Sequence, residues 1–232
     1  MKRHQHIDMI ATIVRGLGDL KDDVVFVGGA TVGFHISDPG APEIRLSEDV
    51  DCVIEITSRN RYYELDEKLR RRGFKDPRGE DHPLCRYEYS GVIVDIMPTD
   101  EKILGFSNRW YREGIKNAKK VELPDGTEIA IFSAPYLFAS KSEAFKGRGH
   151  NDFLGSADME DIIALVDGCE TLKNEINQAS PAIKTYLSEE IHKLLKEDGF
   201  VEAVRAHIES ARAQGNRTER ALSLLQEIAG LN

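Results

Sequence analysis

The chain has few cysteines and aromatic residues, and it carries no excess of positive charge. Its 232 residues include 3 cysteines and 1 tryptophan, and 7% of them are aromatic. The formal net charge of −9 argues against a general affinity for nucleic acid, because phosphate binding depends on a basic surface. No apolar run approaches the length of a transmembrane helix, and the first residues lack the apolar core of a signal peptide. We therefore expect a cytoplasmic protein that does not engage a membrane.

The cysteines show no spacing typical of a zinc site or a redox pair. Cys52 and Cys85 lie in strand-like patterns, and Cys169 stands alone. Buried thiols in a reducing cytoplasm are the simplest interpretation. The 7 histidines form no metal-ligand spacing with these cysteines.

Aspartate residues, in contrast, lie at informative positions. Asp49 and Asp51 are one residue apart on a strand-like pattern, so their side chains project from one face while Val50 points to the other. Asp95 lies in the later apolar run 91–97. If that run is a neighbouring strand, three carboxylates converge, and they repel one another unless something positive lies between them. All-oxygen acidic clusters of this kind suit Mg²⁺ or Mn²⁺, the ions of phosphoryl transfer.

A glycine turn precedes the acidic pair. The apolar run 24–27 predicts a buried strand that leads into Gly28 and Gly29, and an apolar stretch follows as far as Ile36. A strand, a Gly-Gly turn and a helix start leave backbone N–H groups able to face an anion, and a Cβ there would hold a triphosphate away. Such a pair alone is a weak signal. Combined with R-x-S-x-D-x-D over 45–51 and with Asp95, it is much stronger.

This order of motifs resembles the nucleotidyltransferase superfamily of the DNA polymerase β type. The sequence is most similar to the AbiEii-like branch, some of whose members are toxins of toxin–antitoxin and phage-defence systems. That branch has a lysine-bearing helix, which Lys141 and Lys146 match here. It then has a K-D-x-x-D motif, which Asp158 and Asp161 match, although Ala157 replaces the usual lysine.

The resemblance, which covers about residues 22–168, implies roles for individual residues. Asp49, Asp51 and Asp95 would hold two metal ions, one with the nucleotide's phosphates and one that activates the acceptor hydroxyl. Asp95 would accept that hydroxyl's proton, and Lys141 would neutralise charge on the leaving pyrophosphate. The residues expected to bind the nucleotide are Gly28, Gly29, Arg45, Ser47, Lys146 and Asp158.

Each of these assignments has a structural alternative. An isolated Asp-x-Asp is commonly solvated or part of a cap. Lys141 could be a surface lysine whose aliphatic stem lies along its helix. Asp158 and Asp161 could be first-turn acids of a helix capped by Ser156. Arg45 could simply pair with a carboxylate and fix its loop.

The predicted fold class is α+β, with a small mixed β-sheet flanked by helices and a helical C-terminal part. We expect a nucleotidyltransferase-like catalytic domain over 1–168 and a helical appendage over 169–232. Strands are expected at 23–27, 49–56, 84–90 and 91–97, with a further hairpin over 121–129. Helices are expected at 5–17, after the Gly-Gly turn, and at 60–72, 134–146, 158–167, 182–197, 200–213 and 217–229. Residues 103–118 are expected to form a loop or short helix over the site.

The predicted function is transfer of a nucleoside monophosphate from an NTP to an acceptor hydroxyl, with Mg²⁺ or Mn²⁺ as cofactor. The expected acceptor is RNA, tRNA or protein, and an antitoxin partner is a further expectation. Three alternatives stay open: a small-molecule acceptor of the antibiotic type, a plain hydrolase, and a degenerate antitoxin-like binding module. Ala157 counts for the last of these, whereas the intact aspartates count against it.

Overall fold

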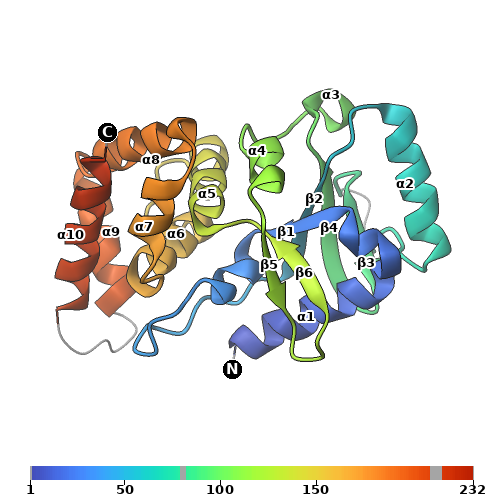
Figure 1. Cartoon of the computed structure of the whole chain (residues 1–232), viewed down its shortest axis with the longest axis horizontal. Coiled ribbons are helices and arrows are strands. Elements are labelled where there is room, and N and C mark those ends of the chain that lie inside the picture. Colours follow the sequence, from blue (N-terminus) through green and yellow to red (C-terminus); the bar gives the residue numbers. More distant parts are fainter. Residues whose placement is uncertain (1, 79–81, 210–215, 232) are drawn as a thin grey trace. The chain divides into compact units, whose positions relative to one another are not determined.

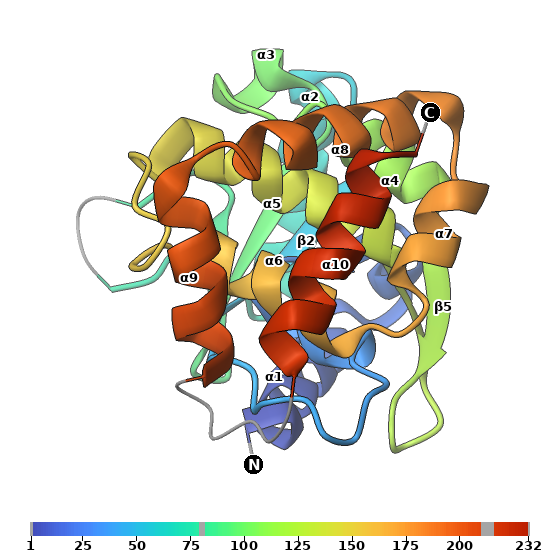
Figure 2. The ribbon, with the colours of Figure 1, turned by 90° about the vertical axis from the view of Figure 1, so that its left-hand side faces the viewer.

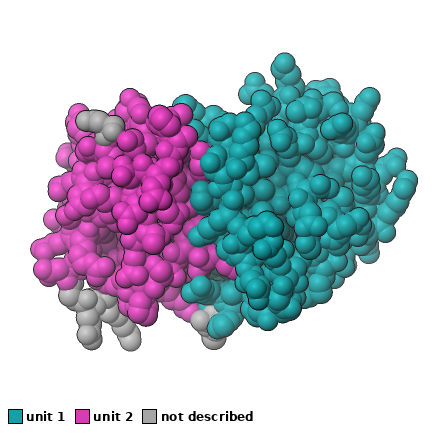
Figure 3. Space-filling view, viewed as in Figure 1, with its two compact units in different colours: residues 1–31, 46–133 teal, residues 32–45, 134–232 magenta. Residues whose placement is uncertain are grey.

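Two compact units make up the described part of the chain. The computed structural model describes residues 2–78, 82–209 and 216–231. Unit 1 consists of residues 1–31 and 46–133, and unit 2 of residues 32–45 and 134–232 (Figure 3). These limits differ from those of the predicted domains 1–168 and 169–232, which stay a prediction. Within the described ranges, no helix is both long enough and apolar enough to cross a bilayer.

Unit 1 is built around a mixed β-sheet, which confirms the α+β class. In the described residues the sheet has six strands in the order β3-β4-β2-β1-β6-β5 (Figure 1). The central strand β2 pairs parallel with β4 and antiparallel with β1, and β1 pairs parallel with β6. The strands are β1 (Val24–Val27), β2 (Asp49–Ile54), β3 (Arg86–Tyr89), β4 (Val92–Pro98), β5 (Lys119–Glu122) and β6 (Glu128–Ile131).

Both predicted hairpins are present, and their turns explain why. Ser90 and Gly91 have φ angles of 50° and 80°, the positive values that tight turns between antiparallel strands demand. Gly126 has φ 84° in the turn between β5 and β6. The register of β3 and β4 follows from the first turn, because a short connection fixes which residues face each other.

Helices of unit 1 begin and end close to the predicted positions. The N-terminal helix α1 packs against β2, β3 and β4 through a buried stripe that includes Ile10, Ile13 and Leu17. A 3₁₀ helix, η2, begins in unit 1 and ends in segment 32–45, and it lies where a helix was expected after the Gly-Gly turn. Two short helices occupy parts of the segment 103–118, for which a loop or short helix was expected. The bounds are α1 (Lys2–Leu17), η1 (Gly18–Asp22), η2 (Gly29–Phe34), α2 (Arg59–Arg71), α3 (Glu101–Leu104) and α4 (Tyr111–Lys116).

Unit 2 is helical, with the segment 32–45 attached to it. Helix α10 packs against α6, α7, α8 and α9 (Figure 2). The predicted helices of this unit are confirmed, except that the predicted end of α9 near residue 213 lies outside the described residues. Helix α7 was not predicted, because it is too short to show a clear spacing of apolar residues. The bounds are α5 (Ala134–Arg148), α6 (Ala157–Gly168), α7 (Leu172–Gln178), α8 (Pro181–Leu194), α9 (Asp198–Glu209) and α10 (Arg217–Ala229).

A buried arginine fastens the segment 32–45 to the helices of unit 2. Arg217, at the start of α10, donates hydrogen bonds to the carboxylates of Asp167 and Asp38 at 2.9 and 2.8 Å. The carbonyl of Gly168 accepts hydrogen bonds from the backbone N–H groups of Ser37 and Asp38. These contacts explain how a segment distant in sequence belongs to the C-terminal helices.

Candidate functional site

The three aspartates selected from the sequence lie on one face of the sheet in unit 1. Asp51 of β2 and Asp95 of β4 are directly paired in the parallel ladder, and paired residues project from the same face. Asp49 lies two residues before Asp51 and therefore shares this face. Asp95 is buried, whereas Asp49 and Asp51 are half-buried. The predicted placement of the carboxylates is thus confirmed, and their metal-binding role stays a prediction.

Arg86, which the sequence reasoning missed, lies between two of these carboxylates. Its Nε and Nη2 atoms donate to Oδ1 and Oδ2 of Asp95 at 2.8 and 2.7 Å. Nη2 also donates to Oδ2 of Asp49 at 3.1 Å. Hydrogen bonding to Asp95 raises the pKa of Arg86, so the guanidinium stays charged. A signal was available, because Arg86 and Asp95 are equally far along the chain from the predicted turn and therefore pair across it.

Gly28 lies close to the carboxylate of Asp51. Its φ angle is 81°, in the left-handed region that favours glycine. A Cβ added there would collide with the Asp51 carboxylate. The carbonyl of Gly28 accepts hydrogen bonds from the backbone N–H and the hydroxyl of Thr31. The predicted contact of Gly28 and Gly29 with a triphosphate stays a prediction, and room for Asp51 is a separate reason for glycine at position 28.

Ser47 connects the start of β2 to helix α1. It is buried, and its backbone N–H donates to Nε2 of His6 at 2.8 Å. Its hydroxyl donates to Oδ1 of Asp49 at 3.4 Å. Because Nε2 of His6 accepts, we assign the other ring nitrogen as protonated. Ser47 and His6 thus help to place Asp49, which is a positioning role that the sequence did not reveal for His6.

Lys141 lies in the interior of unit 2. Its Nζ atom is 3.0 Å from Oδ1 of Asp158 and 2.7 Å from Oδ2 of Asp161, and 7% of the lysine side chain is exposed. The surface-lysine interpretation is therefore wrong. Ser156 caps α6 as expected, by accepting a hydrogen bond from the N–H of Met159. The predicted contact of Lys141 with pyrophosphate stays a prediction, and it would require the lysine to leave both carboxylates.

Two arginines complete a buried ion network with Lys141. Arg45 donates to both oxygens of Asp161 at 2.8 and 2.9 Å, and Arg148 donates to both oxygens of Asp158 at 2.8 and 3.0 Å. Burial opposes ionisation of Asp158, but the hydrogen bond from Arg148 and the charge of Lys141 outweigh it and lower the pKa of Asp158. Arg45 does fix its loop to a carboxylate, as the structural alternative proposed. We call Arg45, Lys141, Arg148, Asp158 and Asp161 the buried ion network, because Lys141 and both aspartates are buried; the Arg148 side chain is 72% exposed and reaches Asp158 from the surface.

Lys146 lies outside this network. Its Nζ atom contacts carboxylate oxygens of Glu143 at 2.6 Å and Glu190 at 3.2 Å, and it lies 4.9 Å from the ring centroid of Tyr186. The predicted site residues thus fall into separate units. Those in unit 1 are Gly28, Gly29, Ser47, Asp49, Asp51 and Asp95, and those in unit 2 are Arg45, Lys141, Lys146 and Asp158.

The short helix α4 lies on the same face of the sheet as the aspartates. The hydroxyl of Tyr111 donates to the sulfur of Met97 at 3.3 Å, and Met97 follows Asp95 by two residues on β4. Phe132 packs against Gly114 of this helix, where no side chain would fit. The expected short helix is therefore present, and it lies on the face that carries Asp49, Asp51 and Asp95, which we call the acidic face; that it covers a functional site stays a prediction.

The implied metal ion would have to find its ligands among the three aspartates. In the described ranges, no three His, Cys, Asp or Glu side chains are grouped closely enough to hold a metal ion. The donor set itself fits, because carboxylate oxygens are what Mg²⁺ and Mn²⁺ prefer. A cation, the guanidinium of Arg86, already bridges Asp49 and Asp95. Rotation of short aspartate side chains between staggered conformers is the adjustment that an ion would need.

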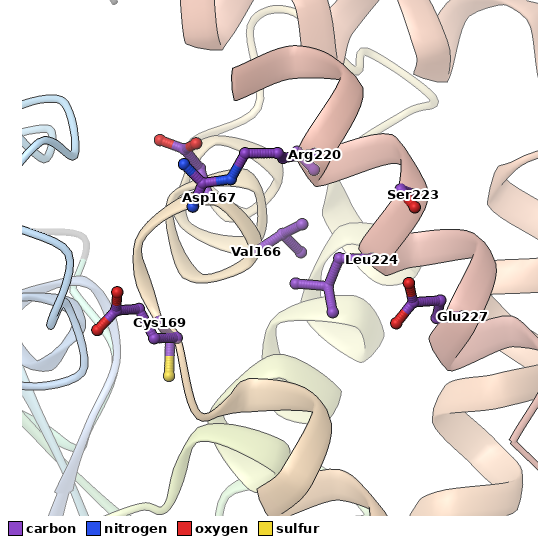
Figure 4. A pocket seen from close by; sticks show the side chains of 9 residues that line it. Val166, Asp167, Cys169, Arg220, Ser223, Leu224 and Glu227 are labelled. Carbon is purple, nitrogen blue, oxygen red and sulfur yellow. The ribbon is translucent and has the colours of Figure 1, made fainter. Parts of the chain in front are cut away.

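A hollow of about 430 Å³ lies between α6 and α10 in unit 2 (Figure 4). Its lining includes Val166, Cys169, Arg220 and Glu227, and none of the predicted site residues is among the nine that line it. Glu227 is paired with Lys173 at 2.7 Å. This hollow is therefore a separate feature from the acidic face.

No family model matches the chain, and no curated protein sequence matches it. An antigenic nucleotidyltransferase-like protein from Paracoccidioides brasiliensis has a TM-score of 0.49 and 19% identity, over 93% of this chain and 99% of that one. JHP933 from Helicobacter pylori has a TM-score of 0.48 and 15% identity, over 99% and 92%. The antibiotic-resistance factor ANT(2'')-Ia has a TM-score of 0.48 and 13% identity, over 84% and 97%. Similarity at this level assigns neither a family nor a function.

Proposed function

We propose that this protein is a metal-dependent nucleotidyltransferase that transfers a nucleoside monophosphate from an NTP to an acceptor hydroxyl. The observation that supports it most is the placement of Asp49, Asp51 and Asp95 on one face of two adjacent parallel strands. Arg86 offsets one of these three negative charges. The negative charge that is left attracts a divalent cation, which in turn binds phosphates.

The chain's own residues divide the work. Asp49, Asp51 and Asp95 would hold Mg²⁺ or Mn²⁺, which when bound neutralises phosphate charge and acidifies the acceptor hydroxyl. Asp95 would take the hydroxyl proton on one of its carboxylate oxygens. Ser47 and His6 position Asp49, and Gly28 leaves room for Asp51.

For the acceptor we propose RNA, tRNA or protein, with an antitoxin as a binding partner. This proposal is supported by the resemblance of the motifs over 45–51 and 157–161 to the AbiEii-like branch. A small molecule of the antibiotic type is the alternative acceptor. Transfer assays with RNA, protein and antibiotic acceptors in parallel separate these classes.

Thermal unfolding with nucleotide and metal tests the proposed binding site. With Mg²⁺ and an NTP at about 100 times its Kd, the folded state should gain about 2.7 kcal/mol. Asp51→Asn should lose this gain, whereas Asp125→Asn, on the exposed β5–β6 turn, should keep it. An equal stabilisation of Asp51→Asn by NTP and Mg²⁺ would show that the acidic face does not bind them.

A non-catalytic binding module is the second candidate, and particular observations favour it. Lys141 is held by Asp158 and Asp161 in the interior of unit 2, and Arg86 takes both oxygens of Asp95. Such a module would bind NTP and metal without transferring the nucleotide. Single-turnover assays with labelled NTP distinguish it from the enzyme.

A further inference from the structure

We propose that Arg86 is an internal cation that takes the place of a divalent ion between Asp49 and Asp95, so that ion binding requires its withdrawal. This inference rests on the proposed function, because it concerns the same three carboxylates. It goes further by assigning a residue that no motif of the sequence singled out. Its consequence is that the protein sets its own threshold for metal.

The geometry of the guanidinium supports competition. Arg86 engages Asp95 in the two-pronged arrangement, with one N–H directed at each oxygen, at 2.8 and 2.7 Å. The same Nη2 atom reaches Asp49 at 3.1 Å. Ligand oxygens of a bound Mg²⁺ lie about 2.1 Å from the ion, so an ion that shares these oxygens would stand beside the guanidinium. A divalent ion and a guanidinium group that contact the same carboxylate oxygens repel each other strongly.

The surroundings of Arg86 allow its side chain to move into solvent. Its side chain is 34% exposed, and that of Asp49 is 30% exposed, so this side of the acidic face is open to solvent. Arg86 lies on β3, which is the edge strand in the described strand order and pairs with β4; on the outer side of β3, Lys75 forms an isolated bridge with Glu88, two residues beyond Arg86. A long side chain at a sheet edge can turn into water while its backbone stays paired with Asp95.

Asp51 differs from the other two aspartates in this respect. In the described part of the chain, Arg86 forms hydrogen bonds with Asp49 and Asp95 but none with Asp51. The Asp51 carboxylate lies against Gly28. Arg86 thus holds two of the three carboxylates in positions set by a planar cation. A divalent ion demands a different arrangement, with oxygens from all three directed at one centre.

Titration with Mn²⁺ alone, followed by the electron paramagnetic resonance signal of the free ion, tests this competition without any enzymatic readout. Arg86→Gln should bind Mn²⁺ at least tenfold more tightly than the wild type, because the competing charge is gone. Arg86→Lys, which keeps the charge but cannot form the two-pronged contact, should fall between them. Arg71→Gln is the matched control, since Arg71 pairs with Glu67 on the exposed surface of α2 and should leave the Mn²⁺ affinity unchanged.

Two further controls test where the Mn²⁺ ion binds and whether Arg86→Gln only changes stability. Adding Asp51→Asn to Arg86→Gln should abolish the gain, which places the bound ion at the aspartates. Without metal, Arg86→Gln should melt at a lower temperature than the wild type, and Mn²⁺ should raise its melting temperature more. A purely structural role for Arg86 predicts the lower melting temperature without the larger response to Mn²⁺.

A measurement on the unmodified chain keeps the proposal testable if Arg86→Gln does not fold. The Nε–H resonance of Arg86, identified by its loss in Arg86→Lys, should shift when Mg²⁺ is added. An unchanged resonance at saturating Mg²⁺ overturns the proposal.

The outcomes separate this inference from the proposed function. If the wild type binds Mn²⁺ and Arg86→Gln binds it no more tightly, the inference fails and the proposed function stands. If neither protein binds Mn²⁺, the metal-dependent function fails together with the inference. A tenfold gain that depends on Asp51 supports both.

Discussion

Asp51 and Gly28 illustrate how closely single residues are fitted on the acidic face. Gly28 has φ 81°, and a Cβ on it would overlap the Asp51 carboxylate. Gly91 has the similar φ of 80°, but a Cβ there would meet nothing within 4 Å. The two glycines therefore separate backbone strain from contact with an aspartate.

Gly28→Ala should cost more stability than Gly91→Ala. Both pay about 1–2 kcal/mol for a left-handed backbone, and only Gly28→Ala also displaces Asp51. Chemical denaturation of both variants measures the difference. In the double variant Gly28→Ala with Asp51→Ala, part of the excess cost should disappear. Equal losses for Gly28→Ala and Gly91→Ala would mean that the contact with Asp51 is unimportant.

Lys141 offers a second comparison at this scale, because Lys146 lies five residues further along the same helix. Lys141→Met should destabilise the protein by about 3 kcal/mol, since it leaves buried carboxylates with less compensation. Lys146→Met should cost less than about 1 kcal/mol, because its contacts are partly exposed. A catalytic Lys141 instead predicts weaker NTP binding at unchanged stability, and measuring both quantities decides between the roles.

At the scale of elements, the buried ion network joins α5, α6 and the segment 32–45 within unit 2. The pKa of Asp158 is lower in the folded chain than its ordinary value of 3.8. As the pH falls, the unfolded carboxyl therefore takes up its proton first. Ionised Asp158 thus contributes stability above about pH 4, and this contribution is lost as the pH falls through the folded-state pKa.

Asp158→Asn should consequently flatten the acid side of the stability profile. Between pH 5 and pH 3, the free energy of unfolding should fall less steeply in Asp158→Asn than in the wild type. Asp23→Asn, an exposed aspartate, should leave the slope unchanged. Urea denaturation at a series of pH values gives the slopes, and parallel curves for the wild type and Asp158→Asn would contradict this account of the network.

Helices and strands were predictable wherever the turn residues and the spacing of apolar residues indicated the same element. The Ser90-Gly91 and Asp125-Gly126 turns fixed both hairpins, and the apolar stripe of α1 fixed the first helix. The aspartates were found because alternation along a strand is a local rule. The role of Arg86 was missed because it depends on Asp95, its partner across the hairpin. The burial of Lys141 was missed because it depends on contacts with α6.

For the whole molecule, the division into units makes a prediction about truncation. Helices α5 and α6 belong to unit 2, and α5 packs against α7 and α8 while α6 packs against α9 and α10. A fragment of residues 1–168 lacks these partners and should expose apolar residues such as Ile162 and Leu165. We expect rapid proteolysis within 134–168 in this fragment and slow proteolysis there in the full chain. Equal protection would favour the predicted domain limit at residue 168.

Transfer of labelled nucleotide tests the central claim most directly. The protein is incubated with each α-³²P-labelled NTP, with Mg²⁺ or Mn²⁺, and with total RNA, proteins or small-molecule acceptors. Asp51→Asn and Asp125→Asn are treated in parallel. The account predicts label in an acceptor for the wild type and for Asp125→Asn, and none for Asp51→Asn. Label transferred equally by Asp51→Asn, or by no variant with any acceptor, would contradict it.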